Sequence, residues 1–200
     1  MNLRLGTKRI AQGASLALAF PGALLCAFGR FSIPFTFFAQ SFAIVPGVIG
    51  DFLRSAFYKF TLQECSLDTV IAFGTFFSRC DARVGANVSI GSFCVIGRVL
   101  IGPRTQISSH VEIPSGRHQH LRNDNGVLFD SADEEVVIGS DCWIGASAIV
   151  MANVGSGTTV GAGSVVVKDL PAGVVAVGNP AQPIRTLAGG PGFSGGRQGR

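Results

Sequence analysis

A repeat of six residues constrains the fold of this chain more than any other feature. Between residues 138 and 169 the sequence divides into short units, each of which begins with an aliphatic residue and usually continues with Gly. The units start at Ile138, Ile144, Val150, Val154, Val160 and Val166, six residues apart except for one interval of four. An α-helix repeats every 3.6 residues and a strand every two, so this spacing predicts a solenoid of units that stack on one another.

The same rhythm extends towards the N-terminus. Earlier units start at Val84, Ile90, Ile96, Ile101, Ile107 and Ile113, and looser ones at Ile71 and Phe77. If each unit is a short strand with a tight corner, its first residue points into a narrow interior and Gly in second place turns the chain at little steric cost. The fifth residue, mostly small or β-branched, is also expected to point inward. Cys94 and Cys142 in fifth positions are therefore interpreted as small apolar residues without a redox role.

Composition divides the chain into three parts. Residues 1–66 form a hydrophobic and amphipathic N-terminal region, and 13 of the 16 Phe lie before residue 80. Residues 67–187 form the repeat domain, which a polar loop interrupts at 116–136. Residues 188–200 are rich in Gly and are expected to be disordered.

Charge and cysteine content narrow the class of protein. The net charge of +4 is modest, and the chain has no block of basic residues interleaved with aromatics, which argues against nucleic acid as a partner. The five Cys are odd in number and form no CxxC pair. A reduced, cytosol-facing protein is therefore expected, rather than a disulfide scaffold or a zinc ribbon.

The N-terminal region has the length and composition of a membrane-associated segment. Residues 10–29 and 31–50 carry no charge, and as helices each would reach about 30 Å, the thickness of a bilayer core. Gly and Pro interrupt both stretches. Residues 51–62 predict an amphipathic helix with Asp51 as N-cap, an aromatic face, and Arg54, Ser55 and Lys59 on the opposite face. Such a helix is typical of a membrane interface.

Three interpretations of this region remain open. The basic start and apolar run fit a cleaved signal peptide, although the apolar character continues far past any cleavage site. The helices can instead pack on the end of the solenoid, since apolar stripes usually belong to a core. Membrane association, as a re-entrant hairpin or a surface anchor, is the interpretation that length and aromatic content favour.

The repeat domain carries a resemblance to a known family. Residues 142–185, CWIGASAIV through VGAGSVVVKDLPAGVVAVGNPAQPIR, are similar to the closing coils of the maltose, galactoside, xenobiotic and serine O-acetyltransferases. Over residues 71–185 the hexads resemble the left-handed β-helix acyltransferases. The resemblance implies an all-β solenoid, a left-handed parallel β-helix of about five coils with three units per coil, preceded here by the hydrophobic helices. It also implies a homotrimer that binds acetyl-CoA in grooves between neighbouring prisms.

The repeat fails in one place. In the unit IPSGRH the fifth position is Arg117, and an unpaired guanidinium in a dry interior would cost several kcal/mol. The chain is therefore expected to leave the prism there and to return at Ile138. Two of the three His, His118 and His120, lie at the start of this loop. Acyl transfer to a hydroxyl needs a base, and His titrates in the useful range.

The related sugar acetyltransferases have their catalytic His five residues after the aliphatic that opens the last unit before the loop. Counted from Ile113 this position is His118, so the resemblance implies that His118 is the general base, with His120 as a possible accessory residue. His110 occupies an outward fourth position and is interpreted as structural. The carboxylate that would orient His118 is left open among Glu112, Asp124, Asp130, Asp133, Glu134 and Glu135. 

No metal is expected. The H-x-H pair at 118 and 120 suggests two ligands, and the γ-class carbonic anhydrases share the hexads and use three His. In that family, however, the ligands come from separate coils, and the spacing here does not match. The activated thioester of acetyl-CoA requires no metal for transfer.

By its motifs, the resemblance also implies a donor site. The expected CoA-binding residues are Trp143, Ala146, Ala162, Val167, Lys168, Asn179 and Pro180. Lys168 would bind a phosphate of CoA as a point charge. Trp143 would shield the pantetheine arm or else pack between subunits. The short unit at Val150 predicts a pinched corner on a coil that borders this groove.

Together these features predict an acetyl-CoA-dependent O-acetyltransferase that acts on a carbohydrate hydroxyl, in a cell-envelope polysaccharide or a lipid-linked sugar. Because acetyl-CoA is cytosolic, the repeat domain is expected on the cytoplasmic face of the membrane, with a wholly cytoplasmic location as the alternative. Two other functions stay open: a soluble acetyltransferase for a small acceptor such as serine or an antibiotic, and a non-catalytic hexapeptide scaffold.

Overall fold

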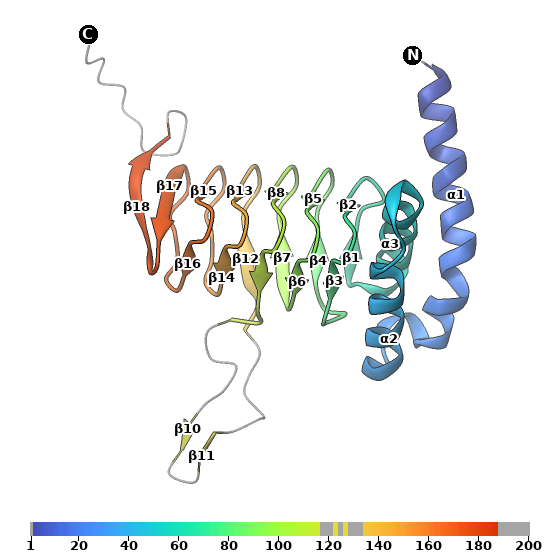
Figure 1. Cartoon of the computed structure of the whole chain (residues 1–200), viewed down its shortest axis with the longest axis horizontal. Helices are drawn as coiled ribbons and strands as arrows, with labels where there is room; N and C mark the ends of the chain where they lie inside the picture. The colour runs from blue at the N-terminus through green and yellow to red at the C-terminus, as the bar shows by residue number, and fades with distance from the viewer. Residues whose placement is uncertain (1, 117–121, 124–125, 128–133, 188–200) are drawn as a thin grey trace.

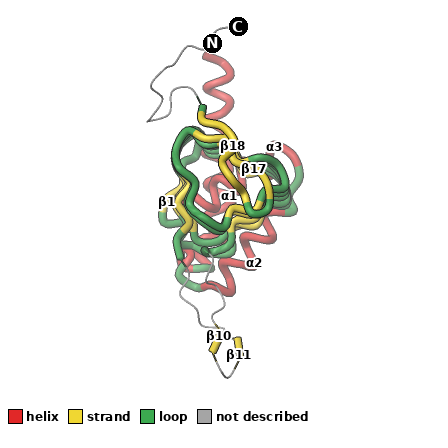
Figure 2. Tube along the Cα trace, turned by 90° about the vertical axis from the view of Figure 1, so that its left-hand side faces the viewer, coloured by secondary structure: helices red, strands yellow, loops and turns green. Residues whose placement is uncertain are grey.

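The chain folds into a three-sided β-helix with a helical cap on its N-terminal end (Figure 1). The computed structural model describes residues 2–116, 122–123, 126–127 and 134–187. The expected disorder of residues 188–200 concerns a segment outside this range. Viewed along its axis, the β-helix is a narrow prism whose coils superimpose (Figure 2).

Parallel pairing between successive coils builds the three sides of the prism. The first side contains β1 (Glu64–Cys65), β4 (Arg83–Val84), β7 (Val99–Ile101) and β12 (Val136–Ile138). The second contains β2 (Val70–Ile71), β5 (Ser89–Ile90), β8 (Gln106–Ile107), β13 (Trp143–Ile144), β15 (Thr159–Val160) and β17 (Val174–Gly178), against which β18 (Ala181–Thr186) pairs antiparallel. The third contains β3 (Phe76–Phe77), β6 (Val95–Ile96), β9 (Glu112–Ile113), β14 (Ile149–Val150) and β16 (Val165–Val166).

The predicted solenoid of about five coils is therefore confirmed. Its first strand, β1, lies one unit before Ile71, where the repeat is too irregular to recognise in the sequence. The strands β10 (Arg122–Asn123) and β11 (Gly126–Val127) form a separate antiparallel pair within the loop region.

The interior of the prism contains the residues that the period of six assigns to it. The aliphatic first positions are at most 3% exposed, as at Ile90, Ile107 and Ile144. The fifth positions are buried as well, including Cys94 and Cys142. Burial raises the pKa of both thiols above the ordinary value, which favours the neutral form and agrees with their interpretation as small apolar residues.

The Gly in second position is required for a different reason from the one expected. None of these glycines has a positive φ; the left-handed conformation falls instead on the fourth position, as in Phe93 and His110. A Cβ on Gly145 would lie 2.5 Å from the backbone nitrogen of Ala162 in the next coil. Gly is therefore needed because successive coils approach too closely for any side chain, not because the chain turns there.

Every departure from the period of six falls at one edge of the prism. Between Cys65 and Val166, inward-pointing residues on the first and second sides are six residues apart. Those on the second and third sides are also six residues apart. The number of residues between the third side and the first side of the next coil varies. The loop of residues 116–136 occupies this same corner in the third coil. The corner after Val150 is short, as predicted: Val154, only four residues later, already pairs with Ile138 and Leu170 on the first side, through isolated bridges.

Three α-helices close the N-terminal end of the prism: α1 (Asn2–Leu25), α2 (Ser32–Ala43) and α3 (Gly47–Thr61), with a short 3-10 turn, η1 (Ala27–Gly29), between the first two. Tyr58 in α3 accepts a hydrogen bond from the Phe77 backbone N–H at 3.0 Å, and the Ser55 hydroxyl donates to the Thr69 carbonyl at 2.7 Å. The helices thus pack on the solenoid's end, as one of the three interpretations expected. Among the helices of the described residues, none is long and apolar enough to cross a membrane.

The predicted orientation of the third helix is wrong. Its N-cap is Pro46 rather than Asp51, and Arg54 and Ser55, assigned to a polar outer face, are buried against the first coil. Arg54 donates hydrogen bonds to the carbonyls of Ile71 at 2.7 Å and Val45 at 2.8 Å, and pairs with Asp51 at 2.6 Å. A guanidinium can be buried here because carbonyl groups from three segments surround it.

Candidate functional site

The loop leaves and re-enters the prism at the corner between the third and first sides. Gly116, the last described residue before the gap, has a φ of +81°, a conformation that favours glycine. On the return, the Glu134 backbone N–H donates to the Ser115 carbonyl at 3.1 Å, and Glu135 pairs with Arg83 at 2.6 Å. The two ends of the loop are therefore fixed close together on the β-helix.

The base that the resemblance implies follows Gly116 in the chain. Arg117, His118 and His120 fall outside the described residues, so their roles stay predictions. Of the six carboxylates considered for orienting the base, three are described and all three lie near the root: Glu112, Glu134 and Glu135.

Two pockets flank the root of the loop. The larger one, of about 260 Å³, lies on the third side and has both polar and apolar walls. It is lined by Ser78, Val95, Gly97, Glu112, Ile113, Pro114 and Ser115. The smaller one, of about 110 Å³, is strongly polar. It is lined by Gly116, Glu134, Glu135, Val136, Met151, Ala152, Asn153 and Asp169.

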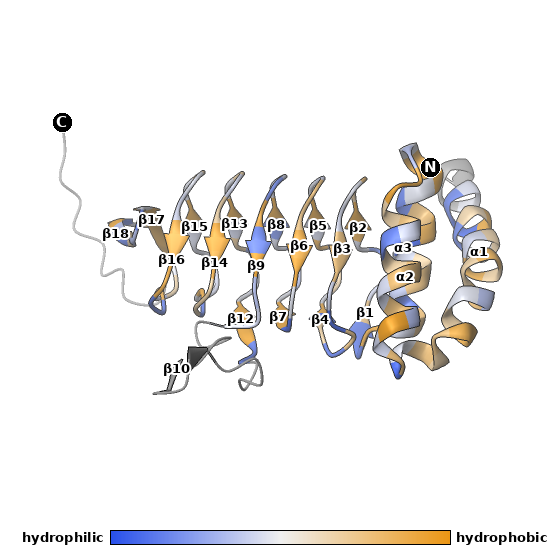
Figure 3. Ribbon diagram, turned by 60° about the horizontal axis from the view of Figure 1, so that its bottom comes forward, coloured by the Kyte–Doolittle hydropathy of each residue, from blue (hydrophilic) through white to orange (hydrophobic). Residues whose placement is uncertain are grey.

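The outward row of the third side is apolar except at one strand. Val95, Ile149 and Val165 point outward from β6, β14 and β16, whereas Glu112 occupies the equivalent place on β9 (Figure 3). The carboxylate of Glu112 is thus held beside the larger pocket, on the strand from which the chain continues into the loop.

Except for Trp143, the predicted donor residues divide between two edges of the third side. Ala146 and Ala162 stack in successive coils at the edge between the second and third sides, where the Gly163 N–H donates to the Ala146 carbonyl at 2.8 Å. Asn179 and Pro180 lie in the turn that links β17 to β18, one coil further along.

Val167 and Lys168 lie at the opposite edge, which is also the edge of the loop, and the Lys168 side chain is exposed. A ligand that touches both sets must therefore cross the third side or lie between two neighbouring prisms. Trp143 points outward from the second side, 57% exposed, with its indole N–H 3.3 Å from the Ser108 hydroxyl oxygen.

A row of stacked aromatic rings, which the sequence did not predict, lies on the Ala146–Ala162 edge. His110 is exposed, as its outward fourth position predicts, and its ring stacks on Phe93 with centroids 5.4 Å apart. Phe93 in turn meets Phe73 edge-on at 5.5 Å. These residues occupy successive corners of the same edge, so the sequence signal is the recurrence of aromatic residues at corner positions of consecutive coils.

In the described part of the chain, no group of three or more His, Cys, Asp or Glu is placed to hold a metal ion.

The repeat domain is similar in sequence to known acetyltransferases. No family model matches the chain. It is 38% identical over 106 residues to the "Putative colanic acid biosynthesis acetyltransferase WcaF" of Escherichia coli K12, an alignment that covers 52% of this chain and 54% of that protein. It is 33% identical over 93 residues to the galactoside O-acetyltransferase of the same organism, covering 44% of each chain. The chain thus spans about half the length of these curated relatives.

The fold extends the similarity further along the chain. A hexapeptide-repeat acetyltransferase from Vibrio cholerae superimposes with a TM-score of 0.66 over 80% of this chain and 91% of the other, at 18% identity. The fold is the left-handed β-helix that the hexads predict. The sequence similarity over about half of the chain and the shared β-helix agree with the resemblance to the hexapeptide-repeat acyltransferases.

Proposed function

We propose that this protein is an acetyl-CoA-dependent O-acetyltransferase whose acceptor is a carbohydrate hydroxyl. The observation that carries the proposal is the interruption of a regular β-helix after Gly116, where two pockets flank the root of a loop that contains His118. The names of two relatives, which refer to colanic acid and to galactosides, support a carbohydrate acceptor.

In the proposed reaction His118 removes the proton of the acceptor hydroxyl while the oxygen attacks the thioester carbonyl carbon of acetyl-CoA. A C–O bond forms and the C–S bond breaks, so that the acetyl group passes directly to the acceptor. The CoA thiolate then takes up a proton, and no acetyl-enzyme forms. His120 is an accessory candidate, and Glu112 and Glu134, which lie at the loop root, are the described carboxylates closest in the chain to His118.

The donor is proposed to lie along the third side, with Ala146, Ala162, Asn179 and Pro180 on one edge. Because Val167 and Lys168 lie on the other edge, the proposed groove uses both edges, and a homotrimer would bring edges of neighbouring prisms together. The apolar row of Val95, Ile149 and Val165 suits such a contact between subunits.

The expected location is the cytoplasmic face of a membrane, with a lipid-linked or envelope-polysaccharide sugar as acceptor. Acetyl-CoA is available on this side, and the basic start of the chain favours it.

A thiol-release assay tests the proposed chemistry. Purified protein and acetyl-CoA are incubated with a panel of free sugars, lipid-linked glycans, serine and an antibiotic that has a hydroxyl group but no sugar. We expect release with saccharide acceptors, and a loss of about 10²–10⁴-fold in kcat for His118→Ala, the contribution typical of a general base. His120→Ala is the matched control in the same loop. Undiminished activity in His118→Ala would overturn the assignment of the base, and release with serine or the sugar-free antibiotic alone would overturn the acceptor class.

A further inference from the structure

The positive charge of this protein is concentrated in the helical cap. Residues 2–62 contain six Lys or Arg and one acid, whereas the remainder contains ten Lys or Arg and eleven acids. The first acidic residue of the chain is Asp51, and it pairs with the buried Arg54. Lys8 pairs with Asp68, while Arg9, Arg30 and Lys59 are exposed. The cap therefore has a net positive charge next to a nearly neutral β-helix.

The same cap exposes most of the large apolar side chains on the surface. Of 19 such residues in the described chain, 12 lie between residues 10 and 49. Ile33 and Phe37 lie one turn apart on α2, Ile44 is its C-cap residue, and all three are 65–84% exposed. On α1, Ile10, Leu18 and Leu25 are 65–74% exposed. Single exposed apolar residues are ordinary, but a concentration of this kind marks an interaction surface.

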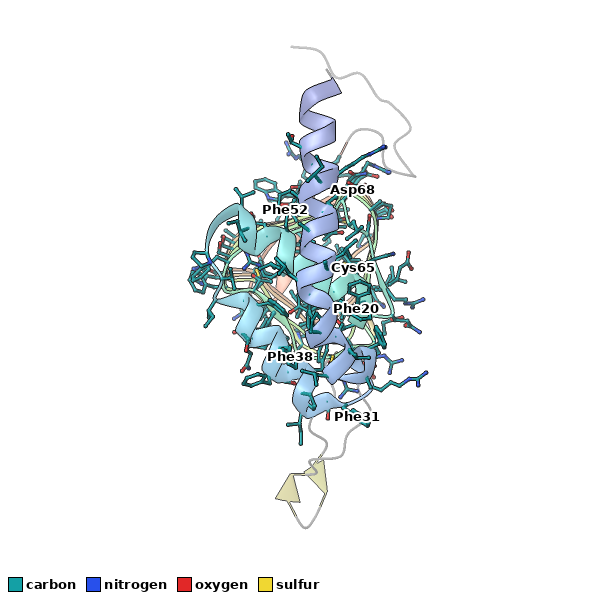
Figure 4. All side chains as sticks on the ribbon, turned by 90° about the vertical axis from the view of Figure 1, so that its right-hand side faces the viewer. Phe20, Phe31, Phe38, Phe52, Cys65 and Asp68 are labelled. Atoms are coloured by element: carbon teal, nitrogen blue, oxygen red, sulfur yellow. The ribbon has the colours of Figure 1, made fainter. Side chains whose placement is uncertain are left out.

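The arrangement of the helices makes this surface one end of the molecule. Viewed from that end, α1 crosses the front and α2 lies beside it (Figure 4). Between α1 and α3 runs an apolar groove of about 180 Å³, lined by Ala11, Ala14, Ser15, Leu18, Ile49, Phe52 and Leu53. The prism extends away from this end, and the strands β17 and β18 lie at the other end (Figure 1).

We infer that the outer faces of α1 and α2 dock on the surface of a bilayer that contains anionic lipids. Apolar side chains would enter the boundary between headgroups and acyl chains, and the exposed Arg9, Arg30 and Lys59 would contact the negative headgroups. Charge complementarity favours lipid as the occupant, because no acidic residue precedes Asp51 in the chain. The sequence suggested residues 51–62 as the interfacial helix. In the structure much of α3 is buried, so α1 and α2 form the proposed interfacial surface instead.

Docking in this way orients the proposed acetyltransferase site, and this step rests on the proposed function. The loop leaves the third coil, two coil spacings of about 4.8 Å from the first. Packed helices lie about 8–10 Å apart, so the loop root would stand roughly 20–30 Å above the lipid. That height suits a saccharide attached to a membrane lipid, rather than a free sugar, as the acceptor.

Vesicle flotation with the full-length protein tests the docking. We expect binding to phosphatidylcholine vesicles that contain phosphatidylglycerol, and weaker binding to phosphatidylcholine alone. The double variant Ile33→Ser/Phe37→Ser should reduce the bound fraction at least tenfold, because it removes two apolar side chains that are 84% and 65% exposed. Ile184→Ser, which removes an exposed apolar group from β18, is the matched control and should bind as the wild type does.

Three outcomes would overturn the inference: no binding of the wild type to either vesicle, equal loss in Ile184→Ser, or a self-association without lipid that Ile33→Ser/Phe37→Ser abolishes. The last would show that a second copy of the chain covers this face. Flotation does not depend on catalysis, so a protein that binds vesicles but releases no thiol would refute the proposed function and leave the docking intact.

Discussion

Replacement of the buried Arg54 by Met should destabilise the helical cap more than any exposed substitution in it. Met has a comparable length and keeps much of the packing, but it cannot donate hydrogen bonds. The guanidinium of Arg54 is fully buried where α3 meets the first coil, and it connects α3 to the end of α2 and to β2. Its loss therefore removes contacts between segments that are far apart in the chain.

The magnitude follows from the carbonyl groups that Arg54 serves. The bonds to Ile71 at 2.7 Å and Val45 at 2.8 Å are short, and a hydrogen bond to a charged group contributes about 1.5–3 kcal/mol. The carbonyls of Phe42 and Ala43 also accept hydrogen bonds from backbone N–H groups, so they would keep one partner each in Arg54→Met. The variant no longer buries a charge, which offsets part of this loss. We therefore expect Arg54→Met to lower the free energy of unfolding of the cap by about 4 kcal/mol.

Hydrogen exchange measures this change locally. Amide groups of residues 47–61 should exchange about a thousandfold faster in Arg54→Met, since each 1.4 kcal/mol is a factor of ten. Arg54→Lys retains three donors on a point charge and should lose about half as much stability. Amides of residues 138–166, in distant coils, should be unchanged.

Lys59→Met provides the matched control, because Lys59 lies on the same helix and is exposed. A substitution at such a site usually changes stability by no more than about 0.5 kcal/mol. If exchange in α3 of Arg54→Met stays within threefold of the wild type, the reasoning that ties the cap to the prism through this residue is refuted.

Two further predictions concern the coils and the donor site. Gly145→Ala should destabilise the β-helix by about 2–3 kcal/mol in thermal unfolding, because the new Cβ meets backbone of the next coil. Gly163→Ala has open space around its Cβ and should cost about 1 kcal/mol because of its positive φ. Equal effects of the two substitutions would contradict the close-approach explanation. Lys168→Gln should raise the KM for acetyl-CoA about tenfold with kcat unchanged, as measured in the thiol-release assay; a fall in kcat alone would exclude a phosphate contact.

Much of the fold can be predicted from the sequence because the β-helix is built from local units. Each inward position recurs every six residues, so Ile90 or Cys142 can be assigned to the core from its place in one unit. The point where the chain leaves the prism can be predicted on the same basis, because Arg117 does not fit an inward position. These inferences need only the chemistry of single residues and their spacing.

The candidate site is only partly predictable. The motif positions of Ala146 and Ala162 share an edge in the structure, but Lys168 lies on the opposite edge, together with the loop. Which edge a residue occupies depends on how many residues each preceding corner contains, and the irregular corners accumulate on one edge. The row of stacked aromatic rings at Phe93 and His110 also becomes evident only when successive coils are stacked.

The sequence by itself determined the repeat, the direction of its side chains and the place of the loop, because these depend on the period of six along the chain. Only the tertiary structure decided that Arg54 is buried, that α1 and α2 rather than α3 form the outer surface, and that Gly145 is needed for contact between coils. Each of these depends on atoms from segments distant in the sequence, such as the carbonyl of Ile71 beside Arg54. A helical pattern identifies an apolar face, but it does not show which polar residue finds buried partners.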